Sequence, residues 1–258
     1  MELRHKIVGF VPLYTADALV LRTYKLGEAD RIVVFLTRDR GKKRGVAKGA
    51  RRHRSRFVGA LEPLTEVRVA YFESERRELV GLNYAETVRS PLLLAGAVGP
   101  PKGGRCKDSD GGPCRESADG GRLRAAPDEN ALGYVGYFAE LIDEWAQEAD
   151  ADDRLYRLGA SMLDALAAGV PAEPLARYFE YWLLRLQGVY PESRGTLSPG
   201  AVTFLAGSRS VAPDQVGGLD ADVRVLRELE TVHRGLIAMH LEKTLKSDRV
   251  LRDLRRHV

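Results

Sequence analysis

The sequence predicts an α+β protein in which a small five-stranded β-barrel precedes an α-helical domain. Short runs of β-favouring residues fill the first 90 positions, and the apolar spacing changes to a helical period after residue 130. A polar segment rich in Gly and Pro separates the two regions. The 258 residues are enough for two modest domains with a buried core.

Five short apolar runs predict the strands of the barrel. We expect strands at Ala18–Tyr24, Arg31–Arg38, Val46–Ala47 and Thr65–Phe72, and a fifth that starts at Leu79–Leu82. Turn signals that contain Gly separate the first three. Five short strands with a basic connection midway are typical of a Greek-key barrel, and the oligonucleotide-binding (OB) fold is the obvious candidate.

The stretch Arg38–Arg56 holds ten Lys or Arg residues against one acid, a formal charge of +9. The whole chain carries +4, so the remainder is negative and the basic character is local. A concentrated basic patch indicates nucleic-acid binding. Glycines at every fourth position disfavour a helix, so we expect a charged loop and strand edge. A solvated basic face or a disordered arm is the alternative interpretation.

OB barrels hold single strands with a charged groove and with aromatic side chains that stack on bases. Tyr24 and Phe57 adjoin basic residues and are the stacking candidates, whereas Phe35 is expected in the core. The candidates for phosphate contacts are Arg22, Lys25, Arg31, Arg38, Arg40, Lys42, Lys43, Arg44, Lys48, Arg51, Arg52, Arg54 and Arg56.

Four segments of the first 66 residues, in order, read LRTYKLGEAD, LTRDRGK, GVAKGARR and SRFVGALEPLTE. They resemble the N-terminal domain of the bacterial DNA repair protein family RecO. The later segment His240–Leu251 (HLEKTLKSDRVL) is similar to the closing helical segment of that family. The resemblance implies an OB barrel followed by a helical domain.

The resemblance also implies the function and the partners. It implies binding of single- and double-stranded DNA, annealing of complementary strands, and action with RecR to help RecA displace single-strand-binding protein (SSB). The acidic, apolar-tipped tail of SSB is expected to dock on the helical domain, with Lys246 and Arg249 as candidate contacts. DNA repair and recombination therefore form the expected role, with RecA as an indirect partner, no enzymatic activity and no small-molecule substrate.

The expected domain boundaries follow the changes in composition. Residues 1–16 form an N-terminal extension, 17–90 the DNA-binding barrel, 96–127 a low-complexity linker or insertion, and 128–258 the helical domain. Cys106 and Cys114 lie in the linker without further ligands nearby, whereas zinc needs about four. Many members of the family carry four zinc-binding cysteines in the region that corresponds to Gly188–Val216, but this chain has none there. We therefore expect no metal and no cofactor.

Polar residues before apolar periods predict the helix starts. Asp128 can cap a first helix, Asp152 or Asp153 a second, and Asp220 or Asp222 the last. A third helix is expected at Glu173–Leu186. Residues 191–216, which include the apolar run Val202–Leu205, are expected to form a small β or irregular element that hydrophobic contacts alone hold in place.

The sequence contains no nucleoside-triphosphate loop, no dinucleotide fingerprint and no HExxH motif. No apolar run approaches the roughly 20 residues of a membrane span, and the N-terminus lacks signal-peptide features. We expect a cytoplasmic, nucleoid-associated protein without membrane contact. Two alternatives remain open: an OB-type RNA-binding module of translation or ribosome assembly, and a metal-dependent nuclease with an unrecognised active site.

Overall fold

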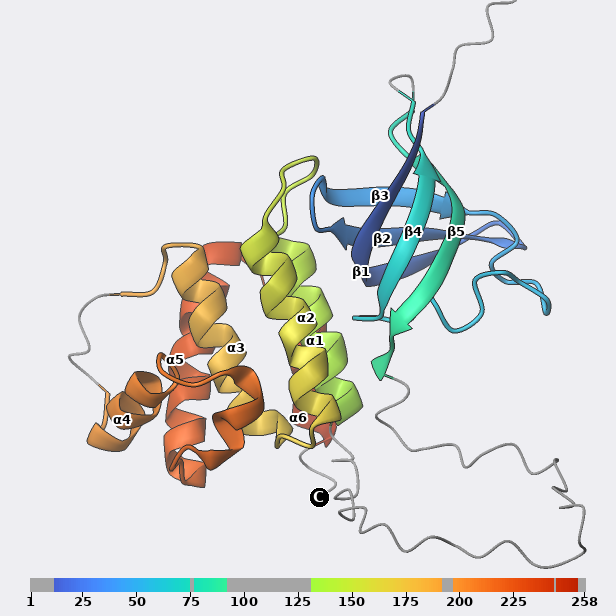
Figure 1. Ribbon diagram of the computed structural model, residues 1–258. Helices are drawn as coiled ribbons and strands as arrows, with labels where there is room; N and C mark the ends of the chain where they lie inside the picture. Colours follow the sequence, from blue (N-terminus) through green and yellow to red (C-terminus); the bar gives the residue numbers. More distant parts are fainter. Residues whose placement is uncertain (1–11, 75–76, 92–130, 192–196, 244, 255–258) are drawn as a thin grey trace, which may run out of the picture.

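A computed structural model describes residues 12–74, 77–91, 131–191, 197–243 and 245–254 (Figure 1). A β-barrel precedes a group of α-helices, and α1 and α2 lie between the barrel and helices α3, α4 and α5. The predicted linker 96–127 with its two cysteines, the predicted cap Asp128 and residues 1–11 lie outside the described residues.

The barrel closes in the strand order β1-β2-β3-β5-β4, which confirms the predicted five-stranded architecture. Its strands are β1 (Leu13–Leu26), β2 (Asp30–Thr37), β3 (Gly41–Ala47), β4 (Glu66–Phe72) and β5 (Val80–Arg89). Neighbours are antiparallel except β3 and β5, whose parallel pairing closes the ring. Closure needs a small residue in β3, because a Cβ on Gly45 would lie 2.9 Å from a methyl group of Val80.

Two strand predictions need correction. β1 begins at Leu13, so residues 13–16 belong to the barrel rather than to an N-terminal extension. β3 runs from Gly41 to Ala47, so the first part of the basic stretch is a barrel strand and not a loop. Three consecutive charged residues, Lys42 to Arg44, hide the strand from a search for apolar runs, because Gly41, Gly45 and Ala47 are the residues that it buries.

Six α-helices make up the described part of the second domain. They are α1 (Ala131–Trp145), α2 (Asp153–Ala167), α3 (Ala172–Leu186), α4 (Pro199–Gly207), α5 (Val223–Leu241) and α6 (Lys246–Leu254), with a 3₁₀ turn at Pro213–Gly218. Asp152 and Asp222 cap α2 and α5 through side-chain bonds to the N–H groups of Leu155 and Val225, as two of the predicted alternatives stated. None of the described helices is both long and apolar enough to cross a bilayer.

The segment after α3 is helical rather than a small β element. Ser198 caps α4 and Pro199 follows at its first position, a start signal that outweighs the β preference of Val202–Leu205. Hydrogen bonds as well as apolar contacts hold the segment, since the Trp182 indole donates to the Ser208 carbonyl at 3.1 Å and Ser198 Oγ donates to Glu228 at 2.5 Å. The prediction that apolar contacts alone suffice is therefore corrected.

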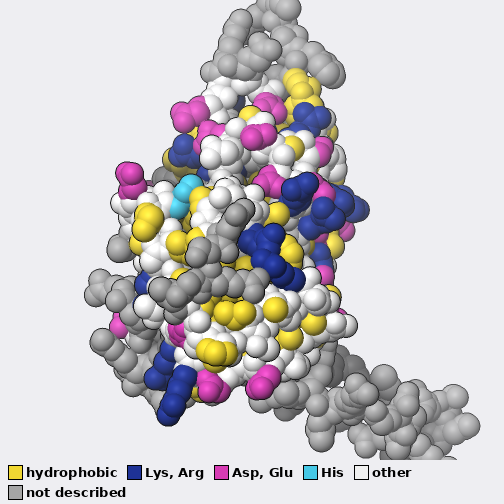
Figure 2. All heavy atoms as spheres, turned by 90° about the vertical axis from the view of Figure 1, so that its left-hand side faces the viewer, with side chains coloured by type: hydrophobic (Ala, Val, Ile, Leu, Met, Phe, Trp, Pro, Cys, Tyr) yellow, Lys and Arg dark blue, Asp and Glu magenta, His cyan; other side chains and the backbone are white. Residues whose placement is uncertain are grey.

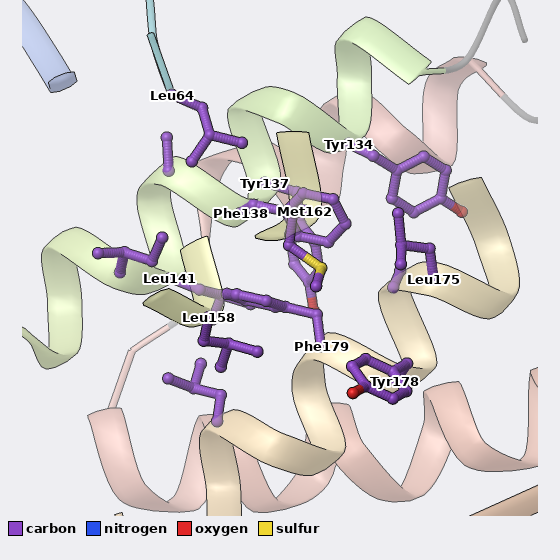
Figure 3. Packing of buried hydrophobic residues seen from close by; sticks show 14 of the residues in the cluster. Leu64, Tyr134, Tyr137, Phe138, Leu141, Leu158, Met162, Leu175, Tyr178 and Phe179 are labelled. Carbon is purple, nitrogen blue, oxygen red and sulfur yellow. The ribbon is translucent and has the colours of Figure 1, made fainter. Parts of the chain in front are cut away.

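The core of the helices extends onto the outside of the barrel. Phe138 of α1 and Phe179 of α3 lie at its centre with ring centroids 4.7 Å apart (Figure 3). The same buried cluster includes five residues of the first domain: Leu19, Leu21, Val34, Leu36 and Leu64. A separate cluster, which contains Phe35 as predicted, fills the inside of the barrel. The two domains therefore share buried apolar surface.

The turn between β2 and β3 also docks on the helical domain. The Lys42 N–H donates to the Gln147 carbonyl at 3.0 Å, and the Ala149 N–H donates to the Lys42 carbonyl at 3.3 Å. Gly41 has a φ of 68°, and a Cβ there would lie 2.3 Å from the backbone oxygen of Asp150. Only glycine fits this contact without a shift of the segment between α1 and α2.

Candidate nucleic-acid interface

The structure divides the basic stretch into two parts. Arg38–Arg44, here called the strand half, covers the turn before β3 and the first part of that strand. Residues 48–56, here called the barrel-end loop, begin the connection from β3 to β4. The two parts differ in what surrounds their cations.

Every Lys and Arg of the strand half lies beside a carboxylate of this chain. The pairs are Arg38 with Asp153, Arg40 with Asp39, Lys42 with Asp143, Lys43 with Glu73 and Arg44 with Glu78. Lys43 Nζ lies 2.6 Å from Glu73 Oε1, and Lys42 Nζ donates to the Asp143 carbonyl at 2.7 Å. The expectation of one continuous basic surface over Arg38–Arg56 is therefore corrected, because a phosphate would have to displace acids in this half.

Arg22 of β1 also faces acids rather than solvent. Its guanidinium lies 3.3 Å from Asp143 and 3.5 Å from Glu140, both on α1. Burial lowers the pKa of Arg22, but its hydrogen bond to Tyr24 and the charges of Asp143 and Glu140 outweigh this and raise the net pKa. Arg22 is thus a cation of the domain interface. The acidic residues of α1 were missed as partners, although their i, i+3, i+4 spacing places them on one helix face.

The barrel-end loop presents its cations to solvent. Lys48, Arg51, Arg52 and Arg54 are exposed, as are His53 and Arg56. None of these side chains forms an ion pair with any residue that the structure describes. The Arg51 guanidinium donates one hydrogen bond to the Gly27 carbonyl, at 2.9 Å, and the Arg56 guanidinium lies 5.1 Å from the centre of the Phe57 ring. This loop is the concentration of available positive charge that the sequence predicted.

Three further predicted residues lie at the same end of the barrel. The register pairs Lys25 with Arg31 across β1 and β2, and Arg31 with Ala47, the residue before Lys48. Tyr24 is adjacent in β1 and is 45% exposed, so its ring is available for stacking on a base. Lys25, Arg31 and the barrel-end loop therefore converge at the end of the barrel that carries the β1–β2 turn.

Phe57 does not have the predicted role. It is 2% exposed and belongs to the core inside the barrel, together with Ala60 and Leu61. Its basic neighbours suggested a surface position, but they are exposed while Phe57 itself packs inward with the apolar residues that follow it. Phe57 anchors the barrel-end loop and offers no face to a base, so its prediction as a stacking residue is wrong.

The helical domain carries a cavity of about 510 Å³ on the side of α3 and α4. Tyr181, Arg185, Tyr190, Leu205 and Arg209 line it. Arg185 Nη1 and Arg209 Nε donate to the Tyr181 hydroxyl at 3.0 and 2.5 Å. Figure 2, which views the face with α3, α4 and α5, shows hydrophobic side chains beside Lys and Arg side chains. The cavity combines two exposed guanidinium groups with aromatic and aliphatic walls.

A buried ionic network supports one wall of this cavity. The Tyr190 hydroxyl lies 3.3 Å from His233 Nε2, and His233 Nδ1 lies 3.0 Å from Glu180. Arg177 donates to the same carboxylate at 2.7 Å. Burial is the largest influence and lowers the pKa of Arg177, but Glu180, Tyr137 and Glu230 together outweigh it and raise the net pKa. The network joins α3 to α5 and fixes Tyr190.

Lys246, the first predicted partner contact at the C-terminus, does not line this cavity. Lys246 is exposed at the start of α6, whose first N–H groups donate to Glu140 of α1. The side chain of Arg249 lies outside the described residues. Among the described residues, no three His, Cys, Asp or Glu side chains gather as metal ligands would.

Comparisons with known proteins agree with this architecture. The model "Recombination protein O N terminal" matches residues 11–91, and "Recombination protein O C terminal" matches residues 126–201. A "DNA repair protein RecO" of Koribacter versatilis is 38% identical over 70% of this chain, and the match spans 61% of that protein. One from Nocardioides sp. is 34% identical over 91% of this chain and 97% of its own length. The chain therefore belongs to the RecO family of DNA repair proteins.

Proposed function

We propose that this protein is a non-enzymatic recombination mediator that binds single- and double-stranded DNA at the end of its barrel. The observation that carries the proposal is the barrel-end loop, in which Lys48, Arg51, Arg52, Arg54 and Arg56 are exposed beside Tyr24 and Lys25. Such cations neutralise phosphates and release counterions, so binding is strongly salt-dependent and tolerant of sequence. The exposed ring of Tyr24 adds a stacking surface for single strands.

The same surface provides a physical route to strand annealing. Two complementary strands repel each other through their phosphates, and cations that neutralise both strands remove much of that barrier. The cations project from a loop rather than from a closed channel, so the surface can accept a second strand. Annealing without hydrolysis is the expected activity.

The test is a salt titration of a fluorescent single strand. Contact with about six phosphates gives a log–log slope of about −4. The variant Arg52→Glu/Arg54→Glu/Arg56→Glu removes three contacts, so the slope becomes shallower by about 2 and all sequences lose affinity alike. The control from the strand half is Lys42→Gln/Lys43→Gln/Arg44→Gln, which removes three cations without placing new acids beside Asp143 and Glu73. It leaves the slope unchanged at a temperature where the variant is folded. A flat salt response of the unaltered protein rejects the proposed surface.

The partner RecR and the SSB tail are part of the proposal. The resemblance to the family implies both, and the cavity beside α3 and α4 fits the tail chemically. Arg185 and Arg209 suit carboxylates, and Tyr181, Tyr190 and Leu205 suit an apolar tip. We therefore place the acidic SSB tail in this cavity rather than at Lys246. In this scheme the protein acts with RecR to help RecA displace SSB.

Peptide binding tests this placement. A fluorescent peptide with the sequence of the SSB tail loses affinity in the variant Arg185→Glu/Arg209→Glu and keeps it in Lys246→Ala. The reverse result moves the site to the C-terminal basic cluster. Capture of RecR by the full chain, with the triple barrel-end variant as a control, tests the remaining partner.

The alternative functions make different predictions. An RNA-binding module prefers RNA when single-stranded RNA and DNA compete for it. A metal-dependent nuclease degrades DNA when magnesium is added. Membership of the RecO family favours the mediator over both.

A further inference from the structure

A carboxylate lies at the base of the proposed DNA-binding surface. Asp30 is the first residue of β2 and is only partly exposed. Its Oδ1 accepts the N–H of Gly49 at 2.8 Å, at the start of the barrel-end loop. Among the described residues it forms no ion pair, although Arg31 is adjacent in sequence and Lys48 precedes its partner glycine.

Two further hydrogen bonds join the loop to the same turn. The Arg51 N–H donates to the Ala29 carbonyl at 2.9 Å, and Arg51 Nη1 donates to the Gly27 carbonyl at 2.9 Å. Gly49 itself has a φ of 71°, a conformation in which its N–H points to Asp30 while the chain reverses. Asp30 is therefore the side chain through which the β1–β2 turn holds the backbone of the loop.

A negative charge at this place works against a polyanion. Phosphates bound to Lys25, Arg31 or Lys48 would lie within about one Debye length of Asp30, roughly 10 Å at 0.1 M salt. If charge alone mattered, removal of this carboxylate would strengthen DNA binding. A carboxylate at this position favours DNA binding overall only if the hydrogen bond to Gly49 strengthens binding more than repulsion of the phosphates weakens it.

We propose that Asp30 is a positioning residue for DNA binding. By holding the Gly49 N–H it fixes the direction in which the barrel-end loop leaves β3, so that the loop cations project together. The loop is also held at Arg51 and by the buried ring of Phe57, eight residues beyond Gly49, while the Arg52 N–H donates to the Gly49 carbonyl at 3.0 Å within the loop. Of these contacts, only the Asp30 bond ties the Gly49 N–H itself to β2. Without the Asp30 bond these residues sample more conformations, and DNA has to order them on binding. The inference rests on the proposed function of the loop.

The direction in which DNA affinity changes in Asp30→Ala distinguishes a positioning role of Asp30 from simple repulsion by its charge. Asp30→Ala removes both the acceptor and the charge, and we expect DNA affinity to fall about fivefold. Asp30→Asn removes the charge but keeps a carbonyl oxygen that can accept the Gly49 N–H, and we expect affinity equal to or above that of the unaltered protein. The matched control is Glu28→Ala in the same turn. Glu28 is exposed and makes no hydrogen bond to a described residue, so its removal strengthens binding.

The experiment measures affinity for a single-stranded oligonucleotide, with fluorescence anisotropy at several salt concentrations, and hydrogen exchange at the Gly49 amide. We expect faster exchange in Asp30→Ala and protection close to the unaltered level in Asp30→Asn. Equal affinity of Asp30→Ala and Glu28→Ala overturns the inference, and so does unchanged exchange at Gly49. Loss of affinity in Asp30→Asn with protection intact also overturns it.

Two outcomes separate this inference from the function on which it rests. If the unaltered protein does not bind DNA in a salt-dependent way, the proposed function fails. If it does bind and Arg52→Glu/Arg54→Glu/Arg56→Glu weakens it while Asp30→Ala does not, only the positioning role fails. Thermal melting identifies any global loss of structure in Asp30→Ala. In that case Asp30→Asn tests the inference: protection of the Gly49 amide with affinity at or above the unaltered level supports it, and loss of affinity with protection intact overturns it.

Discussion

The strand half and the barrel-end loop each carry five Lys or Arg residues and lie only a few positions apart in the chain. In the strand half a carboxylate lies beside each cation, and the acids come from β4–β5, α1 and α2 as well as from the same turn. In the barrel-end loop no described acid pairs with the cations. Two segments with equal charge in the sequence therefore differ in the fold. The cations of the strand half pair with acids of this chain, whereas those of the barrel-end loop face solvent.

The largest effect is expected where the strand half meets the helical domain. Gly41→Ala places a Cβ against the backbone of Asp150 and also strains a residue with φ of 68°. We expect a loss of about 4 kcal/mol in the free energy of unfolding. Gly27→Ala is the control, since Gly27 has φ of 57° with nothing within 4 Å, and should cost about 1 kcal/mol. Urea denaturation of both variants measures the difference; equal losses would contradict the tight contact.

The second largest effect is expected at Phe57, which anchors the barrel-end loop in the barrel core. Phe57→Ala leaves a cavity in the barrel core and is expected to cost about 3 kcal/mol of stability. DNA affinity falls with it, because the loop loses its fixed end. Val58→Ala, at a neighbouring residue that is 73% exposed, changes both quantities little. Stability that stays unchanged in Phe57→Ala would place the ring at the surface after all.

Removal of one cation from the strand half, Lys42, is expected to lower the free energy of unfolding by a smaller amount. Lys42→Met keeps the shape of the side chain but removes one of the two cations beside Asp143, whose side chain is 12% exposed, and leaves only Arg22 at 3.3 Å. We expect a loss of about 2 kcal/mol in unfolding free energy, and DNA affinity within twofold of the unaltered protein at a temperature where both are folded. Weaker DNA binding without loss of stability would show that the strand half contacts DNA.

Acid weakens the contacts that Glu140 of α1 makes with α6 and with Arg22 of β1. Burial raises the pKa of Glu140, but hydrogen bonds from Ser247 and Lys246 and the charge of Arg22 outweigh it, so the net pKa lies below the ordinary 4.5. A lowered folded-state pKa gives stability that is present above pH 4.5 and is lost as pH falls through the folded value. Thermal melting between pH 6 and 3 should show this loss, and Glu140→Gln should make it shallower. An identical pH profile in the variant would exclude a role for Glu140.

The smallest expected effect is the change in DNA affinity when a single cation is removed from either the barrel-end loop or the strand half. Arg52→Gln removes one available phosphate contact and should weaken single-strand binding about threefold, with a salt slope shallower by about 0.7. Arg38→Gln removes a cation that already pairs with Asp153 at 2.8 Å, and should leave affinity and slope unchanged. A salt titration of the two variants side by side checks this, and equal losses would merge the two parts into one surface.

Much of the fold could be predicted from sequence because local rules agree with the final structure. The turn glycines, the apolar strands β2 and β4, and the caps Asp152 and Asp222 are all local signals. The helix α4 was missed because a four-residue apolar run does not distinguish strand from helix, and the Ser198–Pro199 start signal decides it.

The candidate site was harder to predict because availability of charge depends on distant partners. Arg38 meets Asp153, which lies 115 positions away, and nothing near Arg38 in sequence indicates this. Phe57 was misplaced for a related reason, since its neighbours are basic and exposed while its own ring fills the barrel. The acids at positions 140, 143 and 144 were visible as a helix face, but only the fold shows that this face meets β1 and β3.

The shared core between barrel and helices has a mechanical consequence. Because Leu19, Leu36 and Leu64 are buried among helix residues, the barrel cannot swing relative to α1 without exposing apolar surface. In Figure 1 the connection after β3 and helix α4 lie on opposite sides of the molecule. We therefore expect the barrel and the helical domain to move as one unit, with the barrel-end loop and the cavity beside α4 at a fixed distance and orientation.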